Sequence, residues 1–599
     1  MQPSIGQVLR QIRQLRHLTQ RDLAGDRFSK SYVSAIEHDR LVPSSSALRF
    51  FAQRLGQPNG DFVALLQQPE VVNALSVPDI LPPLLSNGKV NQEESAALLE
   101  RLLEARAFPH LFAGGTLATL TPEQLTELPQ HVQAHYSVLL GKEARAQRDL
   151  AAALHAFETA LQFVPAEQQA AILDDIGHTY FLRHAPFTAL GYHLHARHLL
   201  SKASLKRSSA ALFLQIELHC GDTYRALGAY REALEHYERA RSHLNTHHDL
   251  ATAGHLYAKL GYCTYAALFP AFLSSASSAL PPDVTRERIE REAQQALGLL
   301  LQSRSVYQVS GDHLQESNVG LMLTSLLLDW CTWRRRQINE RVSDLEKQTI
   351  LTDCASLLNN AAEHNQSILL RWQHAQTQEE PLVTELDAVL FTTLASLIRI
   401  AVGRALLARL GGSALDVAYR QRAFAAFLCQ RVLDTLSVPT LPWAIVEQVA
   451  VHSAETLEYA APTLPRLPDL PLQPGAPSLH SPLSRIEIYA AAGEVAEELG
   501  RAAPVLAYAR DCYAQSTRFF QAALSLARSL PPQDTHDPGY QARLSQRWVA
   551  LLEERARTSP ALSEATTKVL LDMLAQSFWH LQRLPGELHQ AAHKHEEAH

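Results

Sequence analysis

The sequence predicts an all-α protein in which a small N-terminal helical domain precedes an α-solenoid of helical hairpins. In residues 4–56, apolar residues recur at three- and four-residue steps, the spacing that places them on one face of a helix. Beyond residue 134, glycine, alanine and aromatic residues return in a repeating order. Beyond residue 284, the helical period continues with few glycines or prolines inside the segments.

Four helices are predicted in the N-terminal domain. The apolar face of the first is formed by Ile5, Val8, Leu9, Ile12 and Leu15. Thr19 and Ser29 precede the second and third helices, over 20–24 and 30–37, and can cap them because a side-chain oxygen satisfies free amides of the first turn. A fourth helix is predicted from residue 45 or 46 to Leu55, and the glycine that follows ends it.

This domain resembles the Cro/phage-repressor (XRE-type) helix-turn-helix family. The resemblance is carried by the run 18–24, LTQRDLA, by 28–37, FSKSYVSAIE, by Pro43, and by 47–56, ALRFFAQRLG. The turn at 25–28 is about one residue shorter than the commonest family pattern. The resemblance implies a five-helix, lambda-repressor-like fold that binds double-stranded DNA and regulates transcription.

The resemblance also implies that DNA contacts lie at the start of the second helix and along the exposed start of the third. The candidate DNA-binding residues are Gln20, Arg21, Ser29, Lys30, Ser31, Tyr32, Ser34 and Arg40. The physical chemistry agrees, because the major groove admits one helix and side chains of its first turn reach base edges, where a lysine can donate to guanine.

Charge is distributed unevenly along the chain. Residues 1–66 hold nine Lys/Arg and five Asp/Glu, a net of +4; because the whole chain carries −7, the remainder carries −11. The basic end therefore coincides with the predicted DNA-binding domain. The alternative is a plain helical bundle with surface arginines, or a module for protein contacts.

Composition indicates a cytoplasmic protein without a membrane partner. No uninterrupted apolar run long enough to cross a bilayer was identified, and the first residues lack the pattern of an export signal. The six cysteines are scattered without a CxxC pair, which fits a reducing compartment and argues against both a disulfide scaffold and a zinc site.

The repeating region resembles the tetratricopeptide repeat. The clearest unit lies at 214–241 and contains Gly221, Tyr224, Gly228, Tyr230, Ala233, Tyr237 and Ala240. Similar units contain Gly141 and Gly177, and a fourth begins at Gly261. The steps between these glycines are 36, 44 and 40 residues, longer than the roughly 34 of the family, so we expect extended loops or helices.

In that family the first helix of each repeat lines a concave face. The corresponding residues are Lys142, Arg145, Asp174, His178, Phe181, Asp222, Arg225, Tyr262 and Tyr265. Charged groups interspersed with aromatic rings suit an extended peptide, since charges bind its backbone and termini while rings stack on its side chains. Joined to the N-terminal domain, this array resembles bacterial regulators with a tetratricopeptide sensor, including the peptide-pheromone-responsive group.

The predicted organisation divides the chain at changes of pattern. The regions are 1–68, the helix-turn-helix domain; 69–90, a linker; 91–133, a helical connector; 134–283, tetratricopeptide-like repeats; 284–460, degenerate helical repeats; 461–482, a proline-rich strap; 483–584, C-terminal helical hairpins; and 585–599, a disordered tail. Within 284–460 the helical segments are 286–307, 313–338, 341–375, 382–410, 414–436 and 443–460. A separate helical bundle is the alternative for this region.

The proline-rich strap has a period of three. Prolines recur at every third position from Pro462 to Pro477, with Leu464, Leu467 and Leu470 ahead of three of them. A polyproline II helix has three residues per turn, so the leucines form an apolar edge that can lie on the solenoid. The alternatives are a plain spacer and a ligand for a proline-recognising module.

No catalytic, cofactor or metal site is expected. The phosphate-binding, dinucleotide-binding and hydrolase motifs are absent, and the histidines at 193, 195 and 198 do not share one helical face. We therefore expect a transcription regulator, not an enzyme, whose repeats bind a peptide or protein and mediate homodimer formation. The alternatives are an adaptor or scaffold that the N-terminal domain tethers to DNA, and an enzyme with an unrecognised helical site.

Overall fold

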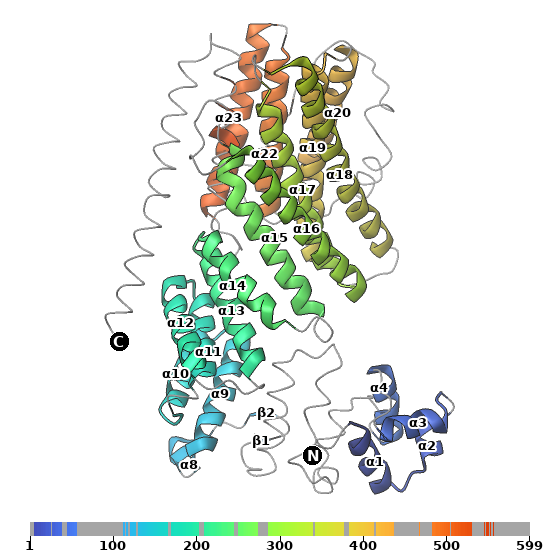
Figure 1. The fold of residues 1–599 in the computed structure, drawn as a ribbon, viewed down its shortest axis with the longest axis vertical. Coiled ribbons are helices and arrows are strands. Elements are labelled where there is room, and N and C mark those ends of the chain that lie inside the picture. Colours follow the sequence, from blue (N-terminus) through green and yellow to red (C-terminus); the bar gives the residue numbers. More distant parts are fainter. Residues whose placement is uncertain are drawn as a thin grey trace. The chain divides into compact units, whose positions relative to one another are not determined.

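A computed structural model of the 599-residue chain divides into two units, which are described separately. One comprises Met1–Thr179 with His247–Asp249, and the other Tyr180–Thr246 with Leu250–His599 (Figure 1). The structure describes residues 5–25, 27–38, 45–56, 112–113, 116–117, 120–126, 128, 130–165, 169–202, 209–244, 250–273, 285–338, 342–376, 383–412, 415–436, 467, 482–503, 505–529, 544, 547–549, 551–552 and 555.

The first unit begins with four short helices, which we call the N-terminal domain. They are α1 (Ile5–Leu15), α2 (Gln20–Ala24), α3 (Lys30–Glu37) and α4 (Ser45–Arg54). Their buried faces share one core, which contains Leu9, Ile12, Leu23, Ala24, Val33, Ile36, Ala47, Phe51, Ala52 and Leu55. The four predicted helices are thus confirmed; a fifth would fall outside the described residues.

The rest of this unit consists of a two-residue strand pair and further helices. Strands β1 (Phe112–Ala113) and β2 (Thr116–Leu117) pair antiparallel. The helices are α8 (Pro122–Thr126), α9 (Gln130–Ala146), α10 (Leu150–Leu161) and α11 (Ala170–Leu182), whose last residues belong to the second unit. Helices α9 and α10 form a hairpin whose turn contains Arg148, at φ +63°.

The described part of the second unit consists mainly of helices. Its helices are α12 (Pro186–Lys202), α13 (Ser209–Ala226), α14 (Tyr230–His243), α15 (Leu250–Leu273), α16 (Arg286–Ser310), α17 (His313–Arg336), α18 (Asp344–Gln376), α19 (Val383–Leu410), α20 (Leu415–Thr435), α22 (Pro482–Arg501) and α23 (Leu506–Ser529). From α12 to α20 each helix contacts the next in the chain, and α15, α17 and α19 also contact one another in succession. This arrangement is an α-solenoid, which confirms the predicted fold class (Figure 1).

Glycine opposite an aromatic ring explains the repeating pattern in the sequence. A Cβ placed on Gly141 would lie 2.6 Å from the ring of Phe157, and one on Gly221 would lie 2.4 Å from the ring of Tyr237. The two helices of each hairpin can therefore approach closely only because the glycine lacks a side chain. The turn between α13 and α14 uses another glycine, Gly228, at φ +75°.

Helix α19 contains the most apolar long stretch found among the described helices. The stretch is Val389–Leu410, which is long and apolar enough to cross a bilayer by length and composition, although Arg399 and Arg404 interrupt its apolar run. Among the described residues, 72 % of this apolar stretch is buried inside the protein. Phe391, Leu394 and Ile398 of this helix belong to an extended apolar core that it shares with α20, α22 and α23.

Several predicted regions lie outside the described residues. These are the linker at 69–90, the segment 443–460, the tail at 585–599, and nearly all of the strap at 461–482. In the strap, Leu467 is described: its side chain is 3 % exposed within the apolar core, and its carbonyl accepts a hydrogen bond of 3.0 Å from Gln515 Nε2. This leucine therefore packs on the second unit, as an apolar edge requires.

Candidate functional site

The two caps predicted in the N-terminal domain are both formed. Thr19 and Asp22 make a reciprocal capping box: the Thr19 hydroxyl accepts from the Asp22 amide at 3.1 Å, and the Asp22 carboxylate accepts from the Thr19 amide at 2.8 Å. Hydrogen bonds from Thr19 lower the pKa of Asp22. Ser29 Oγ accepts from the Tyr32 amide at 3.1 Å and fixes the start of α3.

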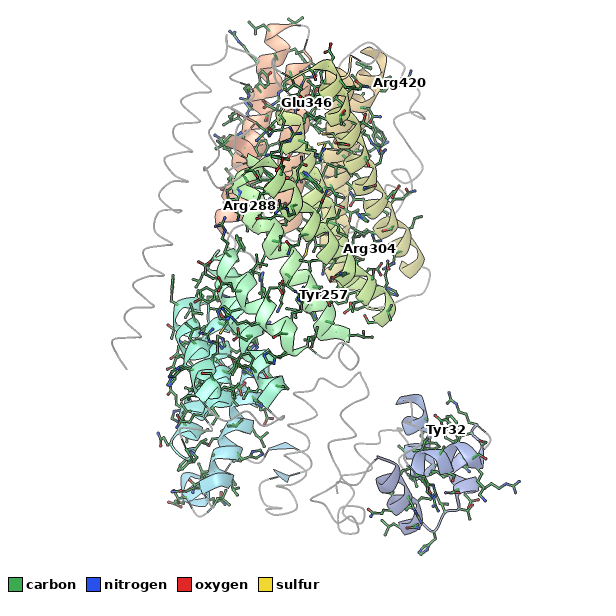
Figure 2. All side chains as sticks on the ribbon, viewed as in Figure 1. Tyr32, Tyr257, Arg288, Arg304, Glu346 and Arg420 are labelled. Atoms are coloured by element: carbon green, nitrogen blue, oxygen red, sulfur yellow. The ribbon has the colours of Figure 1, made fainter. Side chains whose placement is uncertain are left out.

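The corner between α2 and α3 is held by glycine and aromatic packing. Gly25 has φ +55°, a backbone conformation that residues with a side chain rarely adopt. The ring of Phe28 stacks on that of Tyr32 at 4.9 Å and packs on the rings of Phe50 and Phe51. Figure 2 labels Tyr32 in the N-terminal domain. Arg54 also donates from Nη2 to the backbone carbonyl of Asp22 at 2.7 Å, which joins α4 to α2.

The first turn of α3 presents polar side chains to solvent. Ser29, Lys30 and Ser31 are exposed, whereas Val33 and Ile36 of the same helix are buried in the domain core. Arg21 on α2 is also exposed. This surface thus combines free amides of a helix start with two positive side chains, the features that favour a phosphate backbone.

The remaining candidate DNA-binding residues are placed differently. Tyr32 and Ser34 are half-buried, and Tyr32 uses one face of its ring against Phe28. Gln20 Nε2 donates to Glu37 Oε2 at 2.7 Å, so its amide points toward the end of α3. Arg40 lies outside the described residues.

Glu37 has a role that the local pattern did not predict. Its side chain is 1 % exposed and accepts from Arg13 Nε at 2.5 Å and Arg13 Nη2 at 2.9 Å, besides the bond from Gln20. Arg13 also donates to the Leu18 carbonyl at 2.7 Å. One buried carboxylate therefore joins α1, α2 and α3, and fixes the angle at which α3 presents Lys30.

In the first unit, the predicted groove residues Lys142 and Arg145 both interact with the carboxylate of Asp175. Arg145 Nη1 donates to Asp175 Oδ1 at 2.8 Å and its guanidinium lies 5.6 Å from the ring centroid of Phe157. Lys142 Nζ lies 4.0 Å from Asp175 Oδ2, with 30 % of its side chain exposed. Asp174 is fully buried and His178 half-buried. The cations of this region thus tie α9 to α11.

In the second unit, the carboxylate of Asp222 interacts with three side chains, of which Arg225 was predicted to line the groove. Its carboxylate accepts from the Tyr237 hydroxyl at 2.7 Å and from Lys259 Nζ at 2.7 Å, and Arg225 Nε lies 3.8 Å away. Burial alone would raise the pKa of Asp222, but the Lys259 and Arg225 charges outweigh it and hold the pKa well below its usual range. Lys259, which sequence reasoning missed, connects α15 to α13.

The predicted aromatic residues of the groove divide between surface and interior. Tyr262 is half-buried and meets the rings of Tyr230 and Tyr265 edge-on, each at 6.4 Å. Tyr265 is 3 % exposed, and its hydroxyl donates to Asp329 at 2.5 Å. Phe181 is half-buried. Tyr265 therefore stabilises the interior of the second unit through this hydrogen bond.

Comparison with known proteins finds no matching family model and no matching curated protein. Among solved structures, the chain is similar to Bacillus thuringiensis PlcR in complex with the peptide PapR7 and DNA, at 16 % identity, covering 51 % of this chain and 97 % of PlcR with a TM-score of 0.23. It is also similar to a Rap protein complexed with competence and sporulation factor, at 11 % identity, covering 87 % of this chain and 98 % of Rap with a TM-score of 0.27. A circular tandem repeat protein matches at 10 % identity, covering 83 % and 96 %, with a TM-score of 0.27.

Proposed function

We propose that this chain is a cytoplasmic transcription regulator that binds double-stranded DNA sequence-specifically through its N-terminal domain. The observation that carries the proposal is the exposed first turn of α3, where Lys30 and Ser31 lie beside the cap formed by Ser29. A helix presented in this way fits the major groove, and its free amides and positive side chains favour the phosphates on either side. The buried Glu37 supports the same role, because it holds α3 rigidly against α1 and α2.

We further propose that the solenoid binds a peptide or protein and that the protein acts as a homodimer without catalytic activity. Support for ligand binding comes from the alternation of charge and aromatic rings on α13 and α15, where Arg225, Lys259 and Tyr262 are partly exposed. A peptide carboxylate would compete with Asp222 for these cations, and apolar side chains of the peptide would rest on Tyr262.

Selection of bound fragments from random DNA tests the main proposal. The full-length protein should enrich one short motif, and K30A or S31A should each weaken binding to that motif by about 1–3 kcal/mol and relax preference at one base position. The matched control is Q53A, which truncates an exposed side chain on α4 outside the proposed contact surface. Equal binding of the selected and random sequences would instead favour an adaptor that the N-terminal domain tethers to DNA.

A further inference from the structure

Two buried cysteines face each other between α17 and α18. Cys331 lies near the end of α17, and Cys354 lies in the first third of α18. Cys331 Sγ lies 3.7 Å from the carbonyl oxygen of Cys354, and Cys354 Sγ lies 3.6 Å from the carbonyl oxygen of Cys331. Each sulfur thus contacts the backbone of the other residue, which places the two thiols side by side between the helices. We call these two residues the cysteine pair.

The surroundings of the cysteine pair hold the two helices together at this level. Arg334, one turn after Cys331, donates from Nη1 to the carboxylate of Asp353, the residue before Cys354. Both cysteines also belong to one apolar cluster, whose other buried members are Leu327, Leu328, Ile350, Leu358, Ala361 and Ile400. A disulfide requires two closely spaced backbones, so this packing favours a bond between the two sulfurs.

The two thiols of the cysteine pair differ in acidity. A hydrogen bond between them lowers the pKa of Cys354 and raises the pKa of Cys331. The charges of Arg335 and Arg334 lower the pKa of Cys354 further, although burial and the charge of Asp353 oppose them. Burial adds to the rise at Cys331. Because the thiolate is the nucleophilic form, Cys354 is the better nucleophile and Cys331 is the thiol that keeps its proton.

Burial restricts the reagents that can reach the cysteine pair. Cys331 is 4 % exposed and Cys354 is fully buried. Such burial disfavours bulky disulfide reagents, whereas hydrogen peroxide is little larger than water. The thiolate is also the form of cysteine that a peroxide oxidises. The pair is therefore suited to a small hydroperoxide.

We propose that Cys331 and Cys354 form a reversible disulfide when the protein meets a hydroperoxide. The Cys354 thiolate attacks the terminal oxygen of the peroxide, the O–O bond breaks, and the leaving oxygen takes up the proton that Cys354 lost. Cys354 is then a sulfenic acid. The sulfur of Cys331 attacks the sulfenic sulfur, and the proton of Cys331 leaves with the displaced hydroxide as water. The two thiols lose two electrons, and the hydroperoxide is reduced to an alcohol and water.

The disulfide joins α17 to α18 covalently. It closes a loop between residues 331 and 354, which reduces the number of conformations open to the unfolded chain and stabilises the folded one. A dithiol reductant returns both thiols and is itself oxidised to a disulfide. The bond therefore acts as a redox switch on one helical hairpin. It involves residues of the second unit alone and does not depend on the proposed DNA or peptide binding.

Peptide mass spectrometry of the full-length protein tests the proposal directly. Trypsin cleaves after Arg334 and Lys347, so Cys331 and Cys354 are released in separate peptides. After treatment with hydrogen peroxide and alkylation of free thiols in denaturant, we expect these two peptides to be joined with the loss of two hydrogens. Dithiothreitol should release both. Recovery of the two cysteines as alkylated thiols or as sulfinic acids, without the joined peptide, would overturn the proposal.

Two single variants test the order of the steps. In C331S the sulfenic acid at Cys354 has no thiol to attack it, so dimedone should trap it after peroxide treatment. In C354S the better nucleophile is missing, so trapping at Cys331 should be at least tenfold weaker. Equal trapping in the two variants, or stronger trapping at Cys331, would contradict the assignment of Cys354 as the attacking thiol.

Thermal unfolding tests the switch, with C429S as the matched control. Cys429 is a buried cysteine of the second unit that belongs to another apolar cluster. Peroxide should raise the melting temperature of the wild-type protein and of C429S, and leave those of C331S and C354S unchanged. Each oxidised sample is compared with the reduced sample of the same variant, so a loss of stability caused by the substitution itself does not enter. An equal rise in all four proteins would show another cause and overturn the proposal.

Discussion

Arg13 and Glu37 form a two-pronged ion pair between α1 and α3, with Arg13 Nε 2.5 Å from Oε1 and Nη2 2.9 Å from Oε2. The carboxylate is almost fully buried, and Gln20 donates to it from α2. The pair therefore fixes the orientation of α3 from within the domain. Changes at Glu37 should affect DNA binding although this residue does not lie on the exposed surface of α3.

The variant E37A should destabilise the N-terminal domain by about 3–5 kcal/mol, because it leaves the Arg13 guanidinium partly buried without its partner. Hydrogen exchange of the buried amides in α1 and α3 measures this directly. The double variant R13M/E37L removes both charges and should recover most of the loss. Equal protection in E37A and wild type would contradict a stabilising role for the pair.

Glycine-to-alanine substitutions at two helical positions should have opposite effects. G221A places a methyl group 2.4 Å from the Tyr237 ring and should destabilise the protein by about 1–3 kcal/mol through overpacking. G298A meets nothing within 4 Å and should stabilise α16 by about 0.5–1 kcal/mol, since alanine favours the helix. Denaturant unfolding monitored by circular dichroism compares the two, and a loss in both would refute the packing explanation.

Stability should fall as the pH drops from about 6.5 toward 4, in part because of His364. Burial and the neighbouring charge of Arg304, whose Nη1 donates to His364 Nδ1 at 2.6 Å, lower the pKa of this histidine to about 4. Between these pH values the unfolded chain binds a proton at His364 that the folded chain does not, so stability rises with pH. The melting temperature should differ less between pH 5 and pH 7 in the H364Q variant than in the wild-type protein. An unchanged difference would rule out this contribution.

The protein should bind DNA as a dimer. A single N-terminal domain covers few base pairs, so two should occupy a near-palindromic operator with half-sites about 34–36 Å apart or a multiple of that distance. Sedimentation of the full-length protein with and without its selected operator measures the stoichiometry. A monomer in both conditions would contradict the prediction.

The predictions from sequence were accurate where one segment determines its own structure. The caps at Thr19 and Ser29 form as expected because a cap depends on three or four adjacent residues. The predicted segment 286–307 corresponds to α16 at Arg286–Ser310, because the spacing of apolar residues alone sets a helix.

Pairings between distant residues were not predictable in this way. Glu37 pairs with Arg13, 24 positions earlier, and Tyr265 bonds to Asp329, 64 positions later. No local pattern marks such partners, since each is set by the packing of whole helices. For the same reason the chain order gave no indication that Arg399 and Arg547 meet at Asp329.

The succession of contacts from α12 to α20 has a mechanical consequence. Each of these helices contacts its neighbours along the chain, so a bend spreads as small rotations over many helix pairs. We therefore expect the curvature of this array to change through small rotations between neighbouring helices while every hairpin stays folded. Pulled from its two ends, this part of the molecule should lengthen in several small steps and recoil when the load is released.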